Sequence, residues 1–185
     1  SGAMIFYETE VVPVFEGERV IGVTSGTETW GTDLVVAASG APGKVARMLG
    51  TERKSDEPYG IAIRTYVESP RHADHYLEAS LAMRDSAGTA IPGYGWMFPT
   101  GNGTVNLGVG ALSTMKGFKK LNLNTLCDLY RDLIADEWEV GPYLEKPRAW
   151  RLPMTSQKRH GNGWAAVGDA AGLINPMNGE GIDYS

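Results

Sequence analysis

Cysteine is almost absent from this sequence of 185 residues, which contains Cys127 alone. A single thiol excludes an intramolecular disulfide framework and a cysteine-rich zinc site, and it indicates a reducing compartment. Long apolar runs are missing too. The longest uninterrupted one extends from Leu34 to Ala38, far short of the ~20 residues that a membrane-spanning helix requires. The sequence therefore predicts a cytoplasmic protein without a transmembrane helix.

Positive charge is scarce as well. Lysine and arginine together number 17 against 22 acidic residues, for a net charge of -5, and no basic run is longer than the Lys119-Lys120 pair. This balance argues against a nucleic-acid partner. The three histidines lie at His72, His75 and His160, without the spacing of metal ligands, so no metal site is expected. The partner should be a small molecule or another protein.

Glycine and the residues that favour strands are abundant instead. The chain has 24 glycines and 10 prolines within an otherwise globular composition, which favours strands and turns over a helical bundle. Residues 5–14 and 19–24 predict a hairpin. Residues 33–38 form a continuous apolar run, typical of a strand that is buried on both faces. A short helix is expected over 44–49, where Gly50 would end it.

The middle of the chain predicts an antiparallel sheet and one long helix. Residues 60–68 alternate, with Ile63 on one face and Arg64 on the other. Residues 75–83 predict a further strand, Asn102-Gly103 predicts a hairpin between two apolar runs, and residues 148–154 predict a short strand. The helix is expected over 124–138, with an asparagine cap and an apolar stripe. The members of that stripe are Leu126, Leu129, Leu133 and Ile134.

Near the end of the chain, residues 163–169 predict a second buried strand, followed by a turn and a helix that begins near Gly179. The two buried strands, 33–38 and 163–169, are expected in one layer. We therefore predict a fold of class α/β plus α+β, part of an FAD-binding α/β domain with an inserted antiparallel-sheet domain. The expected boundaries are 5–50 and 156–185 for the first domain and 51–155 for the inserted one.

Aromatic side chains alternate in residues 92–99, which read PGYGWMFP. Alternation places Tyr94, Trp96 and Phe98 on one face of a strand, as a continuous aromatic wall. Gly108 and Gly110 follow on the partner strand, where glycine removes side chains at a place that a ligand or ring approaches closely. Three aromatic residues at period two also occur in an ordinary core face, and this reading remains open.

A second pattern lies in residues 168–182, which read GDAAGLINPMNGEGI. A strand that ends in Gly168-Asp169 places a carboxylate at the edge of a sheet, where it can accept hydrogen bonds from ribose or ribityl hydroxyls. Beyond Pro176, the N–H groups of Gly179, Glu180, Gly181 and Ile182 are expected at the start of a helix, a place suited to partial negative charge. A surface aspartate before a turn is the alternative reading.

Both patterns resemble motifs of the geranylgeranyl reductase family within the flavoprotein monooxygenase superfamily. Residues 168–182 are similar to the second FAD-binding motif. The segment Tyr94 to Gly110, including Pro99, is similar to the Tyr-x-Trp-x-Phe-Pro…Gly-x-Gly signature of the reductases. Residues 35–47 resemble a third motif less closely, because Ser39 stands where the family usually has aspartate and Gly43 where it has serine.

The resemblance implies an FAD-dependent oxidoreductase that saturates double bonds of an isoprenoid chain, such as a geranylgeranyl group or the prenyl tail of menaquinone. It implies that Asp169 holds the ribityl chain of FAD, with the residues around it (Gly168, Pro176, Gly179, Glu180, Gly181 and Ile182) completing the cofactor site. Tyr94, Trp96, Phe98, Pro99, Gly108 and Gly110 would bind the substrate. The sequence names neither a catalytic residue nor an electron donor.

The sequence lacks the Gly-x-Gly-x-x-Gly fingerprint with which a complete family member would hold the ADP half of FAD. The chain therefore resembles the middle of a reductase about twice as long, and we expect that alone it is inactive and does not retain FAD tightly. A prenyl-lipid substrate would require a peripheral contact with the membrane, for which Met97 is a candidate. The alternatives are a flavin-dependent monooxygenase or halogenase of an aromatic substrate, and a catalytically silent lipid-binding module.

Overall fold

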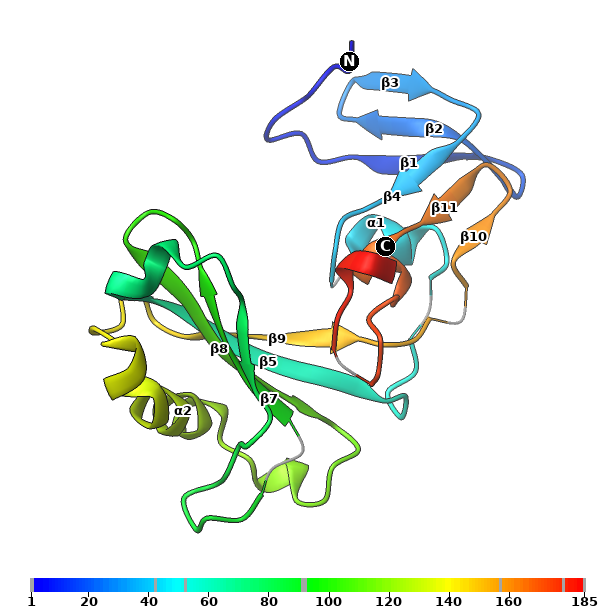
Figure 1. The fold of residues 1–185 in the computed structure, drawn as a ribbon. Coiled ribbons are helices and arrows are strands. Elements are labelled where there is room, and N and C mark those ends of the chain that lie inside the picture. The colour runs from blue at the N-terminus through cyan, green and yellow to red at the C-terminus, as the bar shows by residue number, and fades with distance from the viewer. Residues whose placement is uncertain are drawn as a thin grey trace. The chain divides into compact units, whose positions relative to one another are not determined.

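The computed structural model describes residues 2–41, 43–51, 53–90, 93–156, 158–177 and 179–184. The chain divides into two compact units. Ser1–Glu57 and Pro153–Ser185 form the discontinuous unit, and Pro58–Leu152 form the inserted unit between them in sequence. Figure 1 shows the elements of each unit, in which strands predominate. The mixed α/β class with an antiparallel sheet is as predicted.

Two small sheets build the discontinuous unit. The antiparallel strands β1 (Val12–Glu16), β2 (Arg19–Ser25) and β3 (Glu28–Gly31) form the first. The hairpin expected at the N-terminus is therefore present, but its first strand begins at Val12 rather than at residue 5. The second sheet contains β4 (Val35–Ala37) and β11 (Trp164–Ala166), which pair in parallel, and the short β10 (His160–Gly161).

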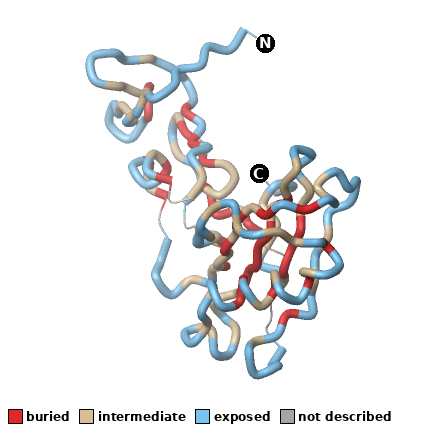
Figure 2. The backbone as a smooth tube through the Cα atoms, turned by 90° about the vertical axis from the view of Figure 1, so that its left-hand side faces the viewer, coloured by how far each residue is buried: buried red, intermediate tan, exposed pale blue. Residues whose placement is uncertain are grey.

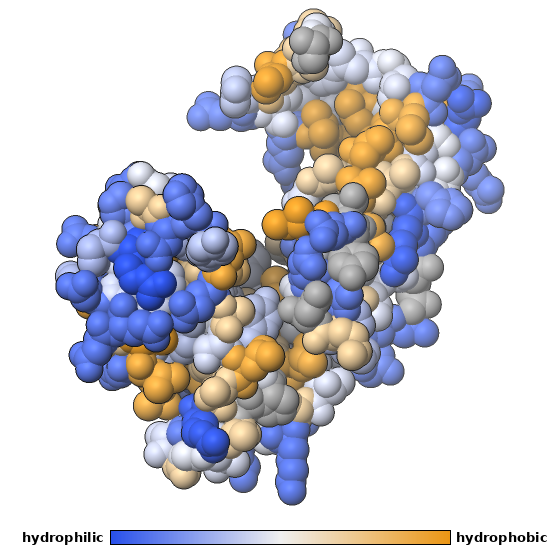
Figure 3. All heavy atoms as spheres, viewed as in Figure 1, coloured by the Kyte–Doolittle hydropathy of each residue, from blue (hydrophilic) through white to orange (hydrophobic). Residues whose placement is uncertain are grey.

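The parallel pairing of β4 with β11 joins the two apolar segments that were predicted to share a layer. Their core side is buried against helix α1 (Lys44–Met48) and contains Val35, Ala37, Trp164 and Ala166. The other side of β4 differs from the prediction, because Val36 is 54% exposed. Within the described residues this strand is therefore buried on one face only. Figure 3 shows apolar side chains gathered over β1 and β4.

The inserted unit contains a five-stranded antiparallel sheet in the order β6-β7-β8-β5-β9. Its strands are β5 (Tyr59–Glu68), β6 (Glu78–Ser80), β7 (Gly93–Pro99), β8 (Thr104–Leu112) and β9 (Arg148–Pro153). β7 and β8 form the hairpin predicted from Asn102-Gly103, and β5 has the predicted bounds to within one residue. The segment 75–83 is a strand only over β6, at the edge of the sheet.

Helix α2 (Leu123–Trp138) covers one side of this sheet, which we call the helix side. Asn122 caps it, accepting a hydrogen bond from the Thr125 N–H at 3.2 Å. The buried stripe differs from the predicted one, because Leu133 is 64% exposed and aromatic rings contribute instead. The buried residues of α2 are Leu126, Cys127, Tyr130, Ile134 and Trp138.

The core of the inserted unit lies between α2 and alternate residues of the strands, among them Ile63, Val67, Leu107 and Met97. Figure 2 colours the buried residues of the chain red. Cys127 is fully buried here, as a small apolar residue, and burial raises the pKa of its thiol. No helix in the described part of the chain has the length and apolar character needed to cross a bilayer.

Candidate functional site

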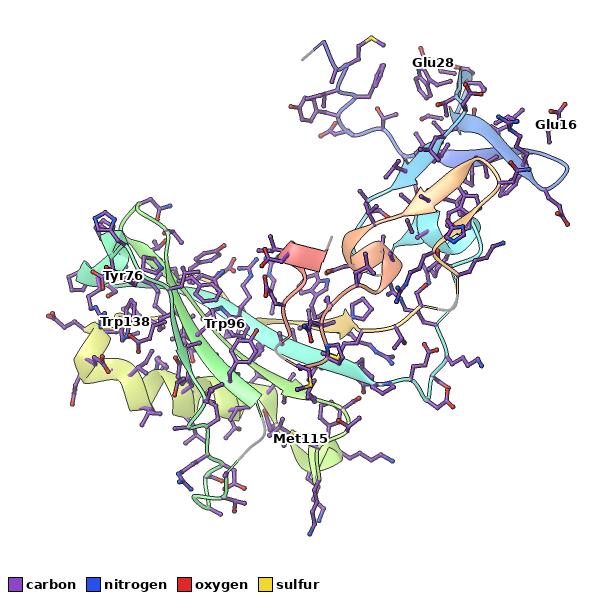
Figure 4. All side chains as sticks on the ribbon, turned by 45° about the vertical axis from the view of Figure 1, so that its right-hand side comes forward. Glu16, Glu28, Tyr76, Trp96, Met115 and Trp138 are labelled. Carbon is purple, nitrogen blue, oxygen red and sulfur yellow. The ribbon has the colours of Figure 1, made fainter. Side chains whose placement is uncertain are left out.

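The aromatic wall predicted from the sequence is present on the side of the sheet opposite α2, which we call the aromatic side. The ring centroids of Tyr94 and Trp96 are 5.6 Å apart, and those of Trp96 and Phe98 are 6.0 Å apart in a stacked arrangement. Figure 4 labels Trp96 on this side and Trp138 on the side of α2. The alternation of β7 therefore separates the wall from the helix-side core.

The wall depends on the absence of a side chain at Gly108. A Cβ atom there would lie 2.1 Å from Cζ2 of Trp96, far inside van der Waals contact. Trp96 is consequently only 9% exposed, since its ring lies directly over β8. At Gly110 the nearest atoms would be 3.7 Å from a Cβ, an ordinary contact. Gly108 thus makes room for the protein's own indole ring, whose small exposed part adjoins the half-buried rings of Tyr94 and Phe98.

Met97, between the aromatic residues, does not fulfil the role considered for it at a membrane contact. It is 0% exposed and belongs to the core cluster of α2. Alternation in the strand directs it to the helix side, which the sequence already indicated. Pro99 ends β7 opposite Val105 and is half-buried. Pro92, the first residue of the motif, lies outside the described residues.

Polar groups occupy the aromatic side beyond β8. Arg64 pairs in register with Gly108, and Tyr66 pairs with Asn106. The Arg64 guanidinium donates to Glu145 Oε1 at 2.6 Å, and its Cζ lies 4.8 Å from the centre of the Tyr66 ring. Asn106 Oδ1 accepts a hydrogen bond from the indole N–H of Trp96 at 2.9 Å. The sequence did not single out Asn106 or Glu145, because no local pattern connects them.

The second candidate region is the Gly168–Asp169 turn of the discontinuous unit. β11 ends at Ala166, and Gly168–Ala171 form a 3-10 turn in which Gly168 has φ 57°, a conformation that favours glycine. Arg53 donates to the carbonyl oxygens of Asp169 and Ala170, at 2.5 and 3.2 Å. Arg53 thus holds two backbone carbonyls of the turn, and the carboxylate of Asp169 takes no part in these hydrogen bonds.

The surroundings of Asp169 fit the polyol portion of a flavin. No hydrogen bond to its carboxylate occurs within the described residues, so the oxygens can accept from hydroxyl groups. A Cβ on Gly181 would lie 3.4 Å from Asp169 Oδ1 and 3.2 Å from Cγ1 of Ile174. The absence of a side chain at Gly181 therefore leaves space beside the carboxylate. Together, the acceptor oxygens and this space match what the sequence motif requires.

The segment after Pro176 does not form the helix expected from Gly179. Asn175 and Glu180 close a tight loop, in which the Gly179 N–H donates to the Asn175 carbonyl at 2.9 Å and the Asn175 N–H donates to the Glu180 carbonyl at 2.7 Å. A single 3-10 turn, Ile182–Tyr184, follows. The N–H of Gly179 is therefore engaged within the loop rather than directed at a ligand.

The remaining residues of the predicted cofactor site lie in or beside this loop. Pro176 is exposed and Ile182 is 86% exposed, while Glu180 and Gly181 are half-buried. Gly179 has φ 73°, so glycine is favoured there for the shape of the loop. Asn178, the neighbour of Gly179, lies outside the described residues. Asp169 and Gly181 are the two members that the structure brings into proximity.

Comparison with known proteins identifies relatives by sequence. The sequence is 40% identical to the menaquinone reductase of Mycolicibacterium smegmatis over 192 residues, covering 100% of this chain and 46% of that protein. It is 30% identical to the chloroplastic geranylgeranyl diphosphate reductase of Arabidopsis thaliana, covering 89% of this chain and 33% of the relative. The chain belongs to the geranylgeranyl reductase family. It spans about half the length or less of these relatives.

The solved structures show the same fold. A geranylgeranyl bacteriochlorophyll reductase-like protein from Thermoplasma acidophilum superposes with a TM-score of 0.69 at 22% identity, covering 93% of this chain and 43% of the other. Flavin-dependent halogenases share the fold at 16% and 18% identity. No family model matches the sequence. The reductase assignment therefore rests on the sequence relatives, and the structures support the fold.

Proposed function

We propose that the protein acts as an FAD-dependent reductase that saturates double bonds of an isoprenoid chain. The observation that carries the proposal is the aromatic wall of Tyr94, Trp96 and Phe98, which lies over Gly108 on the side of the sheet away from α2. An isoprenoid offers only methyl groups and double bonds for recognition. A flat, apolar, aromatic surface binds such a chain without requiring any hydrogen bond from it.

In this proposal the discontinuous unit contributes to the cofactor site. Asp169 accepts hydrogen bonds from ribityl hydroxyls, and Gly181 leaves the space beside it. When bound, reduced FAD supplies the hydride that one alkene carbon takes up while the other receives a proton. The residues of this chain align the substrate and keep water from the aromatic side, which favours reaction through orientation. The tasks of Gly168, Pro176, Gly179, Glu180 and Ile182 are to shape the loop around the cofactor.

The proposed substrate is a prenyl lipid, and the names of the relatives indicate a menaquinone-type or geranylgeranyl tail. A lipid substrate would bring the protein to the periphery of a membrane. Exposed apolar residues, rather than the buried Met97, would then make that contact. We leave the electron donor unassigned, since none of the described residues indicates it.

The direct test is a prenyl-reduction assay on the protein expressed at full length, with dithionite as reductant and the flavin spectrum recorded in parallel. We expect a yellow protein whose product is heavier than its substrate by two hydrogen atoms per saturated bond. Oxygen consumption with an aromatic substrate would instead support a monooxygenase or halogenase. Binding of prenyl lipids without any flavin would support a silent lipid-binding module.

The cofactor assignment has its own matched pair of variants. Asp169→Asn removes the charged acceptor and should weaken FAD binding about 10-fold or more, because hydrogen bonds to charged groups are the stronger ones. Asp136→Asn, on the exposed side of α2, changes the net charge equally and should leave FAD binding unchanged. Equal FAD affinities for the two variants would contradict the role of Asp169. The 185-residue chain alone should bind FAD only weakly.

A further inference from the structure

The aromatic side of the inserted unit changes from apolar to polar across its strands. One row of paired residues runs from Ala79 at the edge of the sheet through Trp96 and Gly108 to Arg64. The β6 end of this row is apolar, and the β5 end is polar, with the ion pair of Arg64 and Glu145. A surface with such a gradient suits an amphipathic ligand in one orientation only.

The apolar end continues beyond the wall at the edge strand. Leu77 and Leu81, which directly precede and follow β6, are 71% and 81% exposed. Tyr76, labelled in Figure 4, is 84% exposed in the same segment. Large apolar side chains therefore border the wall at this edge. The tail of a prenyl lipid can extend over them without meeting a charge from β6 itself, whose only ionisable residue, Glu78, pairs with Met97 of the helix side.

Hydrogen-bond donors gather at the other end. Arg64 uses Nη1 for Glu145, and no hydrogen bond engages its Nε or Nη2 within the described part of the chain. The indole nitrogen of Trp96 can only donate, so the Asn106 atom facing it must be Oδ1. No hydrogen bond engages the amide Nδ2 of Asn106 among the residues that the structure describes, so this group can donate. The hydroxyl of Tyr66, on the residue paired with Asn106, has no hydrogen bond among the described residues.

The charges of Arg64 and Glu145 offset each other. Arg64 and Glu145 form an ion pair with side chains that are 39% and 33% exposed, and Thr65 Oγ1 holds the Glu145 carbonyl at 2.7 Å. The positive charge of the guanidinium is therefore offset where it faces the wall. Balanced charge with donors in excess favours a neutral acceptor, such as a ring carbonyl, over a diphosphate group that brings two or more negative charges.

We propose that Arg64, Tyr66 and Asn106 bind the head group of the substrate, and that this head group is an uncharged ring bearing carbonyl oxygens, as in a prenylated quinone. The tail then extends over Trp96 toward β6. The inference rests on the proposed function, because it assigns a head-group subsite to the same prenyl-binding surface. It also fixes the position of the tail, because a bound head group places one particular double bond at the point of reduction.

Two ligands with the same tail and different heads test the charge argument. We would titrate the protein, expressed at full length, with a menaquinone bearing a geranylgeranyl tail and with geranylgeranyl diphosphate, and follow tryptophan fluorescence. The quinone should bind about 10-fold more tightly, as one or two hydrogen bonds allow. Tighter binding of the diphosphate would overturn the inference. Failure of both ligands to bind would count against the proposed function itself.

Variants at the polar end sharpen the result. Glu145→Gln leaves the cation of Arg64 unbalanced and should shift the preference about 10-fold toward the diphosphate. Tyr66→Phe removes one donor and retains the ring, so quinone binding should weaken several-fold while binding of squalene, which has no head group, stays the same. Lys119→Ala, which removes an exposed cation from the 3-10 turn Phe118–Lys120, serves as the control. Unchanged preferences in all variants would overturn the inference and leave the proposed function standing.

The position of the saturated bond gives a readout that does not depend on total activity. With the menaquinone substrate, mass spectrometry should locate the saturated bond at one position in the original protein. In Arg64→Ala it should be spread over several positions, because the tail can slide once the head is released. Circular dichroism establishes that the variant is folded. A single, unchanged position in the folded variant would show that Arg64 does not fix the head.

Discussion

On each side of the five-stranded sheet, an aromatic ring lies directly over a glycine. On the helix side, a Cβ on Gly95 would lie 2.5 Å from the ring of Tyr130, and on the aromatic side a Cβ on Gly108 would lie 2.1 Å from the ring of Trp96. Tyr130 comes from α2, so its ring joins two elements and closes a core. Trp96 comes from the strand next to Gly108, so its ring connects no further element to the sheet and lies on the outer face. The same close packing therefore joins two elements on one side and, in the proposed function, orders a binding surface on the other.

The largest expected effect on stability comes from removing a large ring from the core on the helix side. Tyr130→Ala should lower the free energy of unfolding by about 4 kcal/mol, as removal of a large buried ring does when its surroundings cannot collapse. Urea denaturation followed by circular dichroism measures it. A loss below about 1 kcal/mol would show that α2 does not depend on this ring.

On the aromatic side, the expected effect comes from adding a side chain beneath the Trp96 ring. Gly108→Ala forces the indole of Trp96 away from β8 and should cost about 1–3 kcal/mol of unfolding free energy, with a red shift of tryptophan emission as the ring becomes exposed. Gly110→Ala, two residues along the same strand, meets its nearest atoms at 3.7 Å and should change neither measurement appreciably. Equal effects of the two substitutions would mean that the ring does not depend on Gly108.

A smaller effect is expected from the anchor of the indole. Asn106→Leu removes the acceptor of the Trp96 N–H, and the expected loss is about 1 kcal/mol, the usual contribution of one hydrogen bond. Thermal unfolding of Asn106→Leu beside Asn102→Ala, a turn substitution on the same hairpin, would separate loss of the anchor from general weakening of the hairpin. A more stable Asn106→Leu protein would contradict the role of this bond.

The smallest effect concerns the hydroxyl of Tyr130, which is buried with no hydrogen-bond partner among the described residues. Burial raises the pKa of this phenol above its ordinary value near 10. The resulting stability is fully present below pH ~10 and is lost as the pH rises above that value. Tyr130→Phe should be as stable as the original at neutral pH, within about 1 kcal/mol, and lose less stability in alkali. Parallel denaturation curves at pH 7 and above pH 10 decide this.

Local patterns predicted the elements that alternate or cap cleanly. Strand β5 followed from its period-two sequence, α2 from its asparagine cap and apolar spacing, and the aromatic wall from three rings at alternate positions. The pairing of β4 with β11 was also expected, because both segments are short apolar runs before small-residue turns. In each case the information lies within about ten neighbouring residues.

The features that the sequence did not predict depend on contacts between distant segments. Leu133 was placed in the buried stripe by its apolar character, whereas Gly95 admits the ring of Tyr130 and rotates that stripe. The polar end of the aromatic side combines Arg64 with Glu145, 81 residues apart, and no local pattern shows such a pairing.

In the proposed function, the position of Trp96 also affects the entropy of binding. Its ring is packed on Gly108 and held by Asn106 before any ligand arrives, so its rotamer is already fixed when the protein folds. A binding surface made of free side chains loses that freedom with each ligand molecule, at about 0.5–1.5 kcal/mol for each side chain that becomes ordered. For Trp96 this loss of side-chain freedom occurs when the protein folds. A featureless hydrocarbon tail, which can form no hydrogen bond to compensate it, meets a surface that is already ordered.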